Sequence, residues 1–231
     1  MKGVPMQCSS HDANPRTEAS TPLPGLSGAE PTVYVIDDDA SVREALADLI
    51  RLSGRDARAF ASAAEFLEIA PAPGPTCLVL DVGLPGLNGL DLQEMIAGER
   101  ADMPIIFITG NGDVPMTVRA MKAGAAEFLT KPFDEDVLLA AIEAALQRSL
   151  AVSKEQIALQ ALRDRRASLS PRECEVMDLV VSGLLNKQVG GELGISEITV
   201  KAHRGRVMEK MQARSLADLV RMSQRLGLHP A

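Results

Sequence analysis

The chain has 231 residues, of which 46% are hydrophobic and 24% charged, as is ordinary for a globular protein of one or two domains. No run of roughly 18 apolar residues exists and the N-terminus lacks an apolar signal segment, so we expect a cytoplasmic protein that does not contact a membrane. The net charge of −7 argues against nucleic acid, but residues 168–231 carry 9 basic and 7 acidic side chains (+2), whereas residues 1–167 carry 15 and 24 (−9). This asymmetry predicts an acidic and a mildly basic domain with different partners.

Residues 1–30 are rich in Pro, Ser, Thr and Ala, and we expect them to form a disordered N-terminal extension. Over residues 31–148, short apolar and β-branched runs alternate with segments whose apolar residues recur at helical spacing. Nearly continuous apolar strands that alternate with helices are typical of a parallel sheet covered on both faces. We therefore predict an α/β domain with a doubly wound, five-stranded, flavodoxin-like parallel sheet.

The expected strands of this domain lie at residues 32–36, 56–60, 76–81, 104–109 and 127–129. The expected helices lie at residues 41–53, 62–69, 90–97, 115–123 and from 135 onward. Ser41 and Glu44 have the spacing of a capping box at the start of the first helix.

Polar side chains follow four of the five predicted strands: residues 37–39 (three Asp) after the first, Asp81 after the third, Thr109 after the fourth and Lys131 after the fifth. Because ligands of doubly wound sheets bind at the carboxyl ends of the strands, we expect these side chains to meet. Clustered carboxylates repel one another unless a cation neutralises them, and Mg²⁺ suits a few carboxylates with water and phosphate oxygens. The pattern favours phosphoryl transfer to Asp81, with Lys131 and the Thr109 hydroxyl contacting phosphate oxygens.

Each of these residues also has an ordinary interpretation. An isolated Asp at a strand end is most often a turn or cap residue, and an isolated Thr there usually satisfies the backbone. A dinucleotide-binding domain is the competing α/β prediction, but it needs the pattern G-x-G-x-x-G after the first strand. Three aspartates stand there instead and would repel a pyrophosphate, while Gly83, Gly86 and Gly89 follow the third strand. The joint pattern therefore favours a phosphorylation site.

Four stretches of the domain carry a family resemblance. VYVIDDD, LVLDVGLPGLNG, FITGNGD and FLTKPF resemble the receiver domain of two-component response regulators. The resemblance implies that Asp81 is the phosphoacceptor and that a sensor histidine kinase donates the phosphoryl group. It also implies that Asp38, Asp81 and the main-chain carbonyl of Gly83 bind Mg²⁺ directly, with Asp37 contributing through water.

The same resemblance assigns Thr109, Phe128 and Lys131 to the switch positions of the family. It implies that phosphate draws Thr109 inward, that Phe128 follows, and that the surface formed by the fourth helix and the fifth strand changes. Through that surface the phosphorylated protein is expected to form a homodimer. The Lys131–Pro132 peptide bond is expected to be cis, a form that X-Pro bonds can adopt in tight turns.

Residues 149–167 are predicted to form a helical linker. No Pro or Gly interrupts the chain from Glu135 to about Arg166, so the last helix of the receiver is expected to run on beyond it. Ser153 and Gln160 interrupt the apolar stripe, which leaves any coiled coil short. The sequence fits two alternatives equally well: one helix followed by a mobile linker, or a short coiled coil through which two copies dimerise.

Residues 168–231 read as a small helical DNA-binding domain. Ser170 at the N-cap and Glu173 three residues later are strong signals for a helix start. Asn186 is expected to cap a second, short helix, and a turn containing Gly leads to a third helix at residues 197–211, before a fourth. Two short helices joined by such a turn fit a helix-turn-helix.

The third helix of this domain has a small, basic face that fits a DNA major groove. Lys201 is expected to read a base edge, and Arg204 and Arg206 to grip phosphates. Lys187 and Thr199 lie near the starts of two helices, where backbone N–H groups and the helix dipole favour binding of a DNA phosphate. The complete set of predicted DNA contacts is Lys187, Thr199, Lys201, Ala202, Arg204, Gly205 and Arg206.

The stretch LSPRECEVMDLVVSGLLNKQVGGELGISEITVKAHRGRV resembles the LuxR-type DNA-binding domain, and with TGNGDVPMTVRAMKAGA it is similar to the FixJ/StyR branch of the NarL/FixJ family. The resemblance implies a transcriptional regulator, not an enzyme acting on an outside substrate, that binds promoter DNA; RNA polymerase is a further candidate partner. Gly190 and Gly191 in the second helix, and Ala202 and Gly205 on the reading face, depart from the family's pattern. The alternative is a receiver that controls a protein-interaction module whose DNA-binding domain is weak or inactive.

Overall fold

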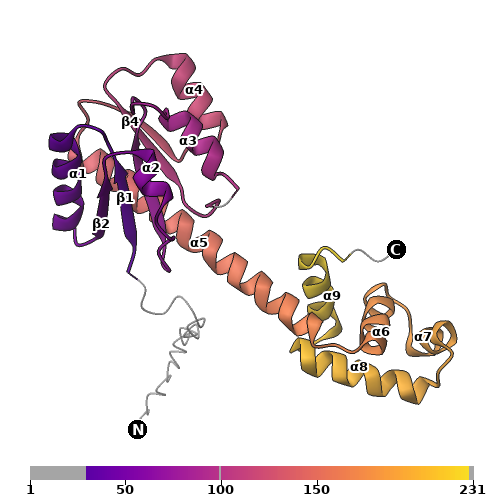
Figure 1. The fold of residues 1–231 in the computed structure, drawn as a ribbon. Coiled ribbons are helices and arrows are strands. Elements are labelled where there is room, and N and C mark those ends of the chain that lie inside the picture. The colour runs from indigo at the N-terminus through magenta and orange to yellow at the C-terminus, as the bar shows by residue number, and fades with distance from the viewer. Residues whose placement is uncertain (1–29, 99, 229–231) are drawn as a thin grey trace, which may run out of the picture.

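The computed structural model describes residues 30–98 and 100–228 and shows a parallel sheet with helices on both faces, followed by a smaller helical domain (Figure 1). Apart from Glu30, the expected disordered extension lies outside the described residues. The strands pair in parallel in the order β2-β1-β3-β4-β5, which confirms the predicted doubly wound α/β fold. The strands are β1 (Thr32–Ile36), β2 (Asp56–Phe60), β3 (Thr76–Asp81), β4 (Ile105–Thr109) and β5 (Glu127–Thr130).

Two apolar clusters lie on opposite faces of the sheet. Alternate residues of β1 show the division, because Val33 belongs to the cluster under α1 and α5, whereas Tyr34 belongs to the cluster under α2, α3 and α4. The central strands β1, β3 and β4 are buried on both faces, which is why their sequences are apolar without alternation. The helices are α1 (Ala40–Leu52), α2 (Ala63–Leu67), α3 (Gly89–Ile96), α4 (Val114–Lys122) and α5 (Glu135–Ala167).

The start of α1 differs from the predicted capping box. Asp39 is the N-cap, and its carboxylate accepts hydrogen bonds from the backbone N–H groups of Ser41 at 2.8 Å and Val42 at 3.3 Å. The prediction of a Ser41–Glu44 box was wrong because the third aspartate of the triplet already satisfies the free N–H groups of the first turn. The first helix therefore starts immediately after the acidic loop and fixes its geometry.

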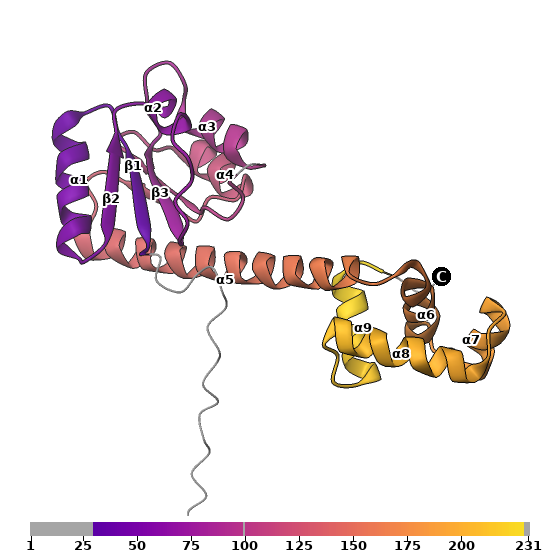
Figure 2. The ribbon, with the colours of Figure 1, turned by 60° about the horizontal axis from the view of Figure 1, so that its bottom comes forward.

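Helix α5 is 33 residues long and continues unbroken through the predicted linker, residues 149–167. Figure 2 shows it passing along the receiver and on to the C-terminal helices. Within the described ranges, 30–98 and 100–228, no helix combines the length and the apolar character that crossing a membrane requires. The C-terminal helices are α6 (Pro171–Val181), α7 (Asn186–Leu193), α8 (Glu197–Met211) and α9 (Leu216–Arg225).

The predicted capping box of α6 is confirmed. The Ser170 hydroxyl accepts from the Glu173 N–H at 3.3 Å, and the Glu173 carboxylate accepts from the Ser170 N–H at 2.9 Å. Lys210 of α8 also donates to Glu173, at 2.6 Å. This hydrogen bond from Lys210, together with that from Ser170, lowers the pKa of Glu173 to about 2. Glu173 thus takes part in the cap of α6 and also links this helix to α8.

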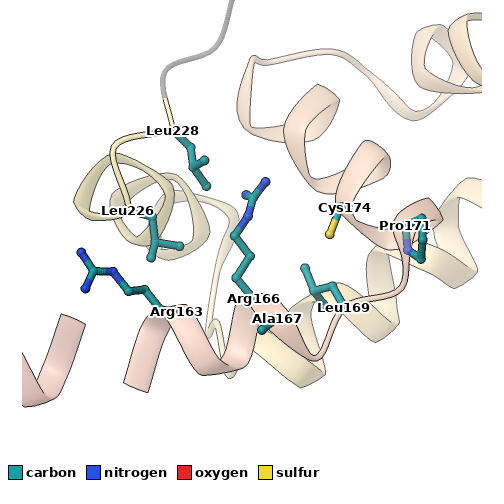
Figure 3. Close-up of a pocket in the computed structure, with 8 residues that line it drawn as sticks. All are labelled: Arg163, Arg166, Ala167, Leu169, Pro171, Cys174, Leu226 and Leu228. Carbon is teal, nitrogen blue, oxygen red and sulfur yellow. The ribbon is translucent and has the colours of Figure 1, made fainter. Parts of the chain in front are cut away.

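The end of α5 packs directly on this domain. Arg166 pairs with Asp178 at 3.2 Å, and Arg225 of α9 reaches back to Glu155 at 2.8 Å. An open, mainly apolar pocket of about 550 Å³ lies at the junction. Figure 3 shows the side chains of Arg166 from α5 and Leu226 after α9 at its edge. Because exposed ion pairs contribute little, the apolar contacts carry most of the stabilisation here.

Candidate phosphorylation site and DNA interface

The predicted carboxylates meet at the carboxyl end of the sheet. Asp81, the last residue of β3, is 7% exposed, and Asp37, directly after β1, is 1% exposed. Lys131 follows β5 and its ammonium group bridges them, 2.8 Å from Asp81 Oδ1 and 2.7 Å from Asp37 Oδ2. Backbone groups hold the other oxygens: the Gly83 N–H donates to Asp81 Oδ2 at 2.6 Å and the Asp39 N–H to Asp37 Oδ1 at 3.0 Å. Each carboxylate is therefore fixed in orientation.

The charges of this site are unequal, with two buried carboxylates facing one ammonium group. Burial lowers the pKa of Lys131, but its hydrogen bonds to Asp37 and Asp81 outweigh that effect and hold the pKa above its ordinary value. Lys131 therefore stays protonated and cancels one of the two negative charges. The remaining negative charge is unfavourable in a partly buried site and favours a second cation.

The metal ligands predicted from the family resemblance are only partly assembled. Asp37 and Asp81 share the buried site, whereas Asp38 is exposed beside it. In the part of the chain that the structure describes, no group of three or more Asp, Glu, His or Cys side chains is close enough together to hold a metal ion. Carboxylate oxygens with space for water nevertheless suit Mg²⁺, which commonly keeps several waters and takes few protein ligands. The donors fit Mg²⁺ in kind, and the role of the Gly83 carbonyl stays a prediction.

The predicted switch residues lie next to this site. Thr109, the last residue of β4, is 5% exposed, and its hydroxyl accepts from the Asn111 N–H at 3.2 Å. Phe128 in β5 is half-buried, and its ring centroid lies 6.2 Å from that of Phe107. The Lys131–Pro132 bond is cis, as expected.

Two glycines around the site were not recognised from the sequence. A Cβ on Gly112 would lie 3.0 to 3.1 Å from side-chain carbons of Thr109, Phe128 and Thr130. Because glycine has no Cβ, these side chains can lie close together around it. A Cβ on Gly89 would lie 2.7 Å from the main-chain oxygen of Asp81. Both glycines belong to motifs of the receiver resemblance, FITGNGD and LVLDVGLPGLNG. The need for glycine at these positions, however, follows only from the atoms that surround them in the fold.

The predicted DNA contacts divide into an exposed and a half-buried group. Arg204 is half-buried and donates to the Asn186 side chain at 3.1 Å. Thr199 is half-buried, and its hydroxyl lies 2.8 Å from that of Ser196, the N-cap of α8. Lys201 is exposed and pairs with Glu197 at 3.1 Å. The exposed group consists of Lys187, Lys201, Ala202, Gly205 and Arg206.

The start of α7 corrects a second capping prediction. Asn186 does not cap this helix but is its first residue, with its side chain turned to Arg204. The residue before it, Leu185, is the N-cap, and its N–H donates to the side chain of Gln188 at 2.8 Å. Gln188 thus satisfies the N–H of Leu185, no described side chain caps the first turn of α7, and Arg204 is engaged within the protein.

Gly190 has a structural reason that the sequence did not reveal. A Cβ there would lie 2.8 Å from the carbonyl oxygen of Ile195, in the turn between α7 and α8. The chain makes this turn through Gly194 in the left-handed conformation, with φ of 64°. Gly191, one residue later, faces open space. The helix-turn-helix therefore requires the first glycine for close packing but not the second.

Comparison with known proteins identifies both domains. The response regulator receiver domain family matches residues 33–143, and the luxR family of bacterial regulatory proteins matches residues 167–223. Nodulation protein W of Bradyrhizobium diazoefficiens is 51% identical over 212 residues, covering 92% of this chain and 90% of that protein. The chain is a response regulator of the NarL/FixJ family.

Other relatives of this response regulator cover the same two domains. The transcriptional regulatory protein FixJ of Bradyrhizobium diazoefficiens is 43% identical over 196 residues, or 85% of this chain and 96% of that protein. The solved structure of the response regulator StyR is 48% identical, with a TM-score of 0.77, and covers 85% of this chain and 100% of that one. The protein is thus a transcriptional regulator of a two-component system, with a receiver and a LuxR-type DNA-binding domain.

Proposed function

We propose that Asp81 accepts a phosphoryl group from a sensor histidine kinase and that the phosphorylated protein binds promoter DNA as a homodimer. The observation that carries the proposal is the pair of buried carboxylates, Asp37 and Asp81, bridged by the ammonium group of Lys131. A carboxylate nucleophile beside a lysine that can meet a phosphate oxygen, with an excess negative charge that a bound cation would balance, is the arrangement that phosphoryl transfer requires. The chemistry serves the protein's own switch, and an outside substrate is not turned over.

Phosphoryl transfer requires one Asp81 oxygen to attack phosphorus while the bond from phosphorus to the donor nitrogen breaks and its electron pair stays with the donor. Gly83 fixes one oxygen of the nucleophile through its N–H, and Lys131 is placed to pair with a phosphate oxygen. Bound Mg²⁺, held by Asp37, Asp38 and Asp81, would neutralise charge that develops on the phosphoryl group. Water later hydrolyses the acyl phosphate and restores the carboxylate.

The switch begins with Thr109. Its hydroxyl accepts from the Asn111 N–H and can donate its own proton to a phosphate oxygen. Phe128, which lies with Thr109 around Gly112, then moves with it. The surface of α4, which packs beside β5, exposes large apolar side chains, among them Val118 and Met121, each at 44%. Covering these side chains in a second copy of the chain is favourable and supports a dimer with two-fold symmetry.

The DNA-binding step is assigned to the exposed face of α8. Lys201 is free to leave its exposed pair with Glu197 for a base edge, and Arg206 and Lys187 to contact phosphates. Ile198 adds an apolar contact, since it is 80% exposed in the first turn of α8 and thymine methyl groups line the major groove. A dimer then reads two half-sites, and RNA polymerase is a further candidate partner.

The test compares binding of the full chain to a promoter fragment with and without a phosphodonor such as acetyl phosphate. We expect phosphorylation to tighten binding in the wild type and to have no effect in Asp81→Asn. Asp91→Asn is the matched control, because Asp91 is an exposed carboxylate of α3 that pairs only loosely with Arg119, at 3.5 Å. Acid-labile labelling that persists in Asp81→Asn would place the phosphoacceptor elsewhere.

The competing function is a receiver that controls a protein-interaction module. The exposed large apolar side chains near the DNA-reading face, Leu185 at 71% and Ile198 at 80%, are the observation that favours it. Binding to any DNA fragment that stays weak and independent of salt, with or without phosphodonor, would favour this function over ours.

A further inference from the structure

A separate pocket of about 290 Å³ lies away from the phosphorylation site. Thr76, the first residue of β3, lines it, whereas Asp81 is the last residue of that strand. Its wall also includes Ala72 before β3, Gly98 and Arg100 after α3, and Gln156 of α5. The pocket therefore joins the loops at the amino end of the sheet to the helix that leads to the DNA-binding domain.

Arg100 is the unusual side chain of this pocket, because it is only 9% exposed. One terminal nitrogen, Nη2, donates to the carbonyl of Ile69 at 2.8 Å, and the guanidinium carbon lies 4.4 Å from the ring centroid of Phe66. The other terminal nitrogen, Nη1, is buried and has no hydrogen-bond partner among the described residues. Arg stays protonated in proteins, so a permanent charge is buried here with a donor unused.

The remaining wall combines aromatic and polar groups. Tyr34 lines the pocket and packs edge to face on the ring of Phe66 with centroids 5.4 Å apart, and its hydroxyl accepts from the Ala72 N–H at 3.0 Å. That contact leaves the hydroxyl's own proton available to a ligand. Asp102, half-buried, also lines the pocket and would oppose a ligand with more than one negative charge.

We propose that this pocket binds a small organic monocarboxylate, whose oxygens accept from the guanidinium group of Arg100. A carboxylate would supply an acceptor for this guanidinium group and a counter-charge that no described residue provides within ion-pair distance, and the volume of about 290 Å³ accommodates a small organic acid. Gln156 brings the ligand into contact with α5. The site is independent of phosphoryl transfer, since it shares no residue with the cluster around Asp81.

The test titrates the full chain with sodium acetate, sodium glycolate and inorganic phosphate at constant ionic strength while nitrogen NMR follows the side-chain N–H groups of Arg100. We expect a saturable shift with both carboxylates. In Arg100→Gln the affinity for acetate should fall by at least about tenfold, as for loss of a charge-assisted hydrogen bond. Arg58→Gln, which removes an exposed guanidinium paired with Asp56, should leave the affinity within about twofold.

A second variant covers the case in which Arg100→Gln does not fold. A Cβ on Gly98 would meet no atom within 4 Å, so Gly98→Leu should fold and fill the mouth of the pocket while Arg100 keeps its contacts. Unchanged acetate affinity in Gly98→Leu would overturn the proposal. A shift that does not saturate would also overturn it, and tighter binding of phosphate than of acetate would overturn the assignment to carboxylates.

Discussion

The receiver and the DNA-binding domain place their charges in opposite ways. In the receiver, Asp37 and Asp81 are buried and face Lys131, so each charge interacts strongly with its neighbours. In the C-terminal domain, Lys201 and Arg206 are exposed on α8, where water and salt screen them. A buried cluster suits a switch because one added charge changes its balance, whereas an exposed face suits binding to a polyanion that releases counterions.

Of the changes that test this comparison, removal of Lys131 is expected to lower the free energy of unfolding the most. Lys131→Ala leaves two buried carboxylates without their shared cation, and we expect the free energy of unfolding to fall by about 3 kcal/mol in urea denaturation. The response to phosphodonor should be lost as well. Lys122→Ala, which removes an exposed lysine at the end of α4, is the control and should change stability by less than about 0.5 kcal/mol. Added Mg²⁺ should reduce the loss, and equal losses with and without it would contradict cation binding at this site.

The two adjacent glycines of α7 give the next largest effect. Gly190→Ala should lower the free energy of unfolding by about 2 kcal/mol, because the new methyl group meets the Ile195 carbonyl at 2.8 Å. Gly191→Ala should raise stability by up to about 1 kcal/mol, because it faces open space and alanine favours helix. Thermal unfolding of the two variants measures both. Similar changes in the two would mean that the helix-turn-helix is not packed as described.

Gly112→Ala tests the coupling between site and switch. The added methyl group would press on Thr109, Phe128 and Thr130 at 3.0 to 3.1 Å, and side chains can move aside, so we expect a stability loss of only about 1 kcal/mol. The DNA affinity gained on phosphorylation should shrink, because the space needed by the moving Phe128 is filled. Gly110→Ala is the control, since a Cβ there meets no atom within 4 Å. If Gly112→Ala gained as much DNA affinity on phosphorylation as the wild type, coupling through Thr109 and Phe128 would be excluded.

The smallest effect is expected for Glu173, and it should depend on pH. The pKa of Glu173 is lowered from 4.5 to about 2, chiefly by the hydrogen bond from Lys210. Because the pKa is lower in the folded state, the stabilisation is present above the unfolded value and is lost as pH falls from about 5 to about 2. The stability difference between wild type and Glu173→Gln should shrink over this window. Glu175→Gln, which removes an exposed carboxylate paired with Arg172, should show a smaller dependence.

Much of the phosphorylation site was predictable, because it depends on where strands end. Asp37, Asp81, Thr109 and Lys131 each follow an apolar run, and parallel strands bring their carboxyl ends to one edge. The hydrogen bonds that orient the carboxylates, from backbone N–H groups, were not predictable, since they depend on loop geometry. The two capping errors have different origins: at α1 another polar residue, Asp39, caps the helix in place of Ser41, whereas at α7 the Asn186 side chain accepts from Arg204 of α8.

The sequence by itself determined the order of strands and helices, the two domains and the acidic and basic residues on which function rests, because these follow from periodicity and residue type. Only the tertiary structure decided that Arg204 binds Asn186, that Gly190 faces Ile195 and that Arg100 lies buried with an unused donor. Each of these depends on a neighbour distant in sequence or across a turn. Local pattern sets which side chains are available, whereas close packing sets which atoms they meet.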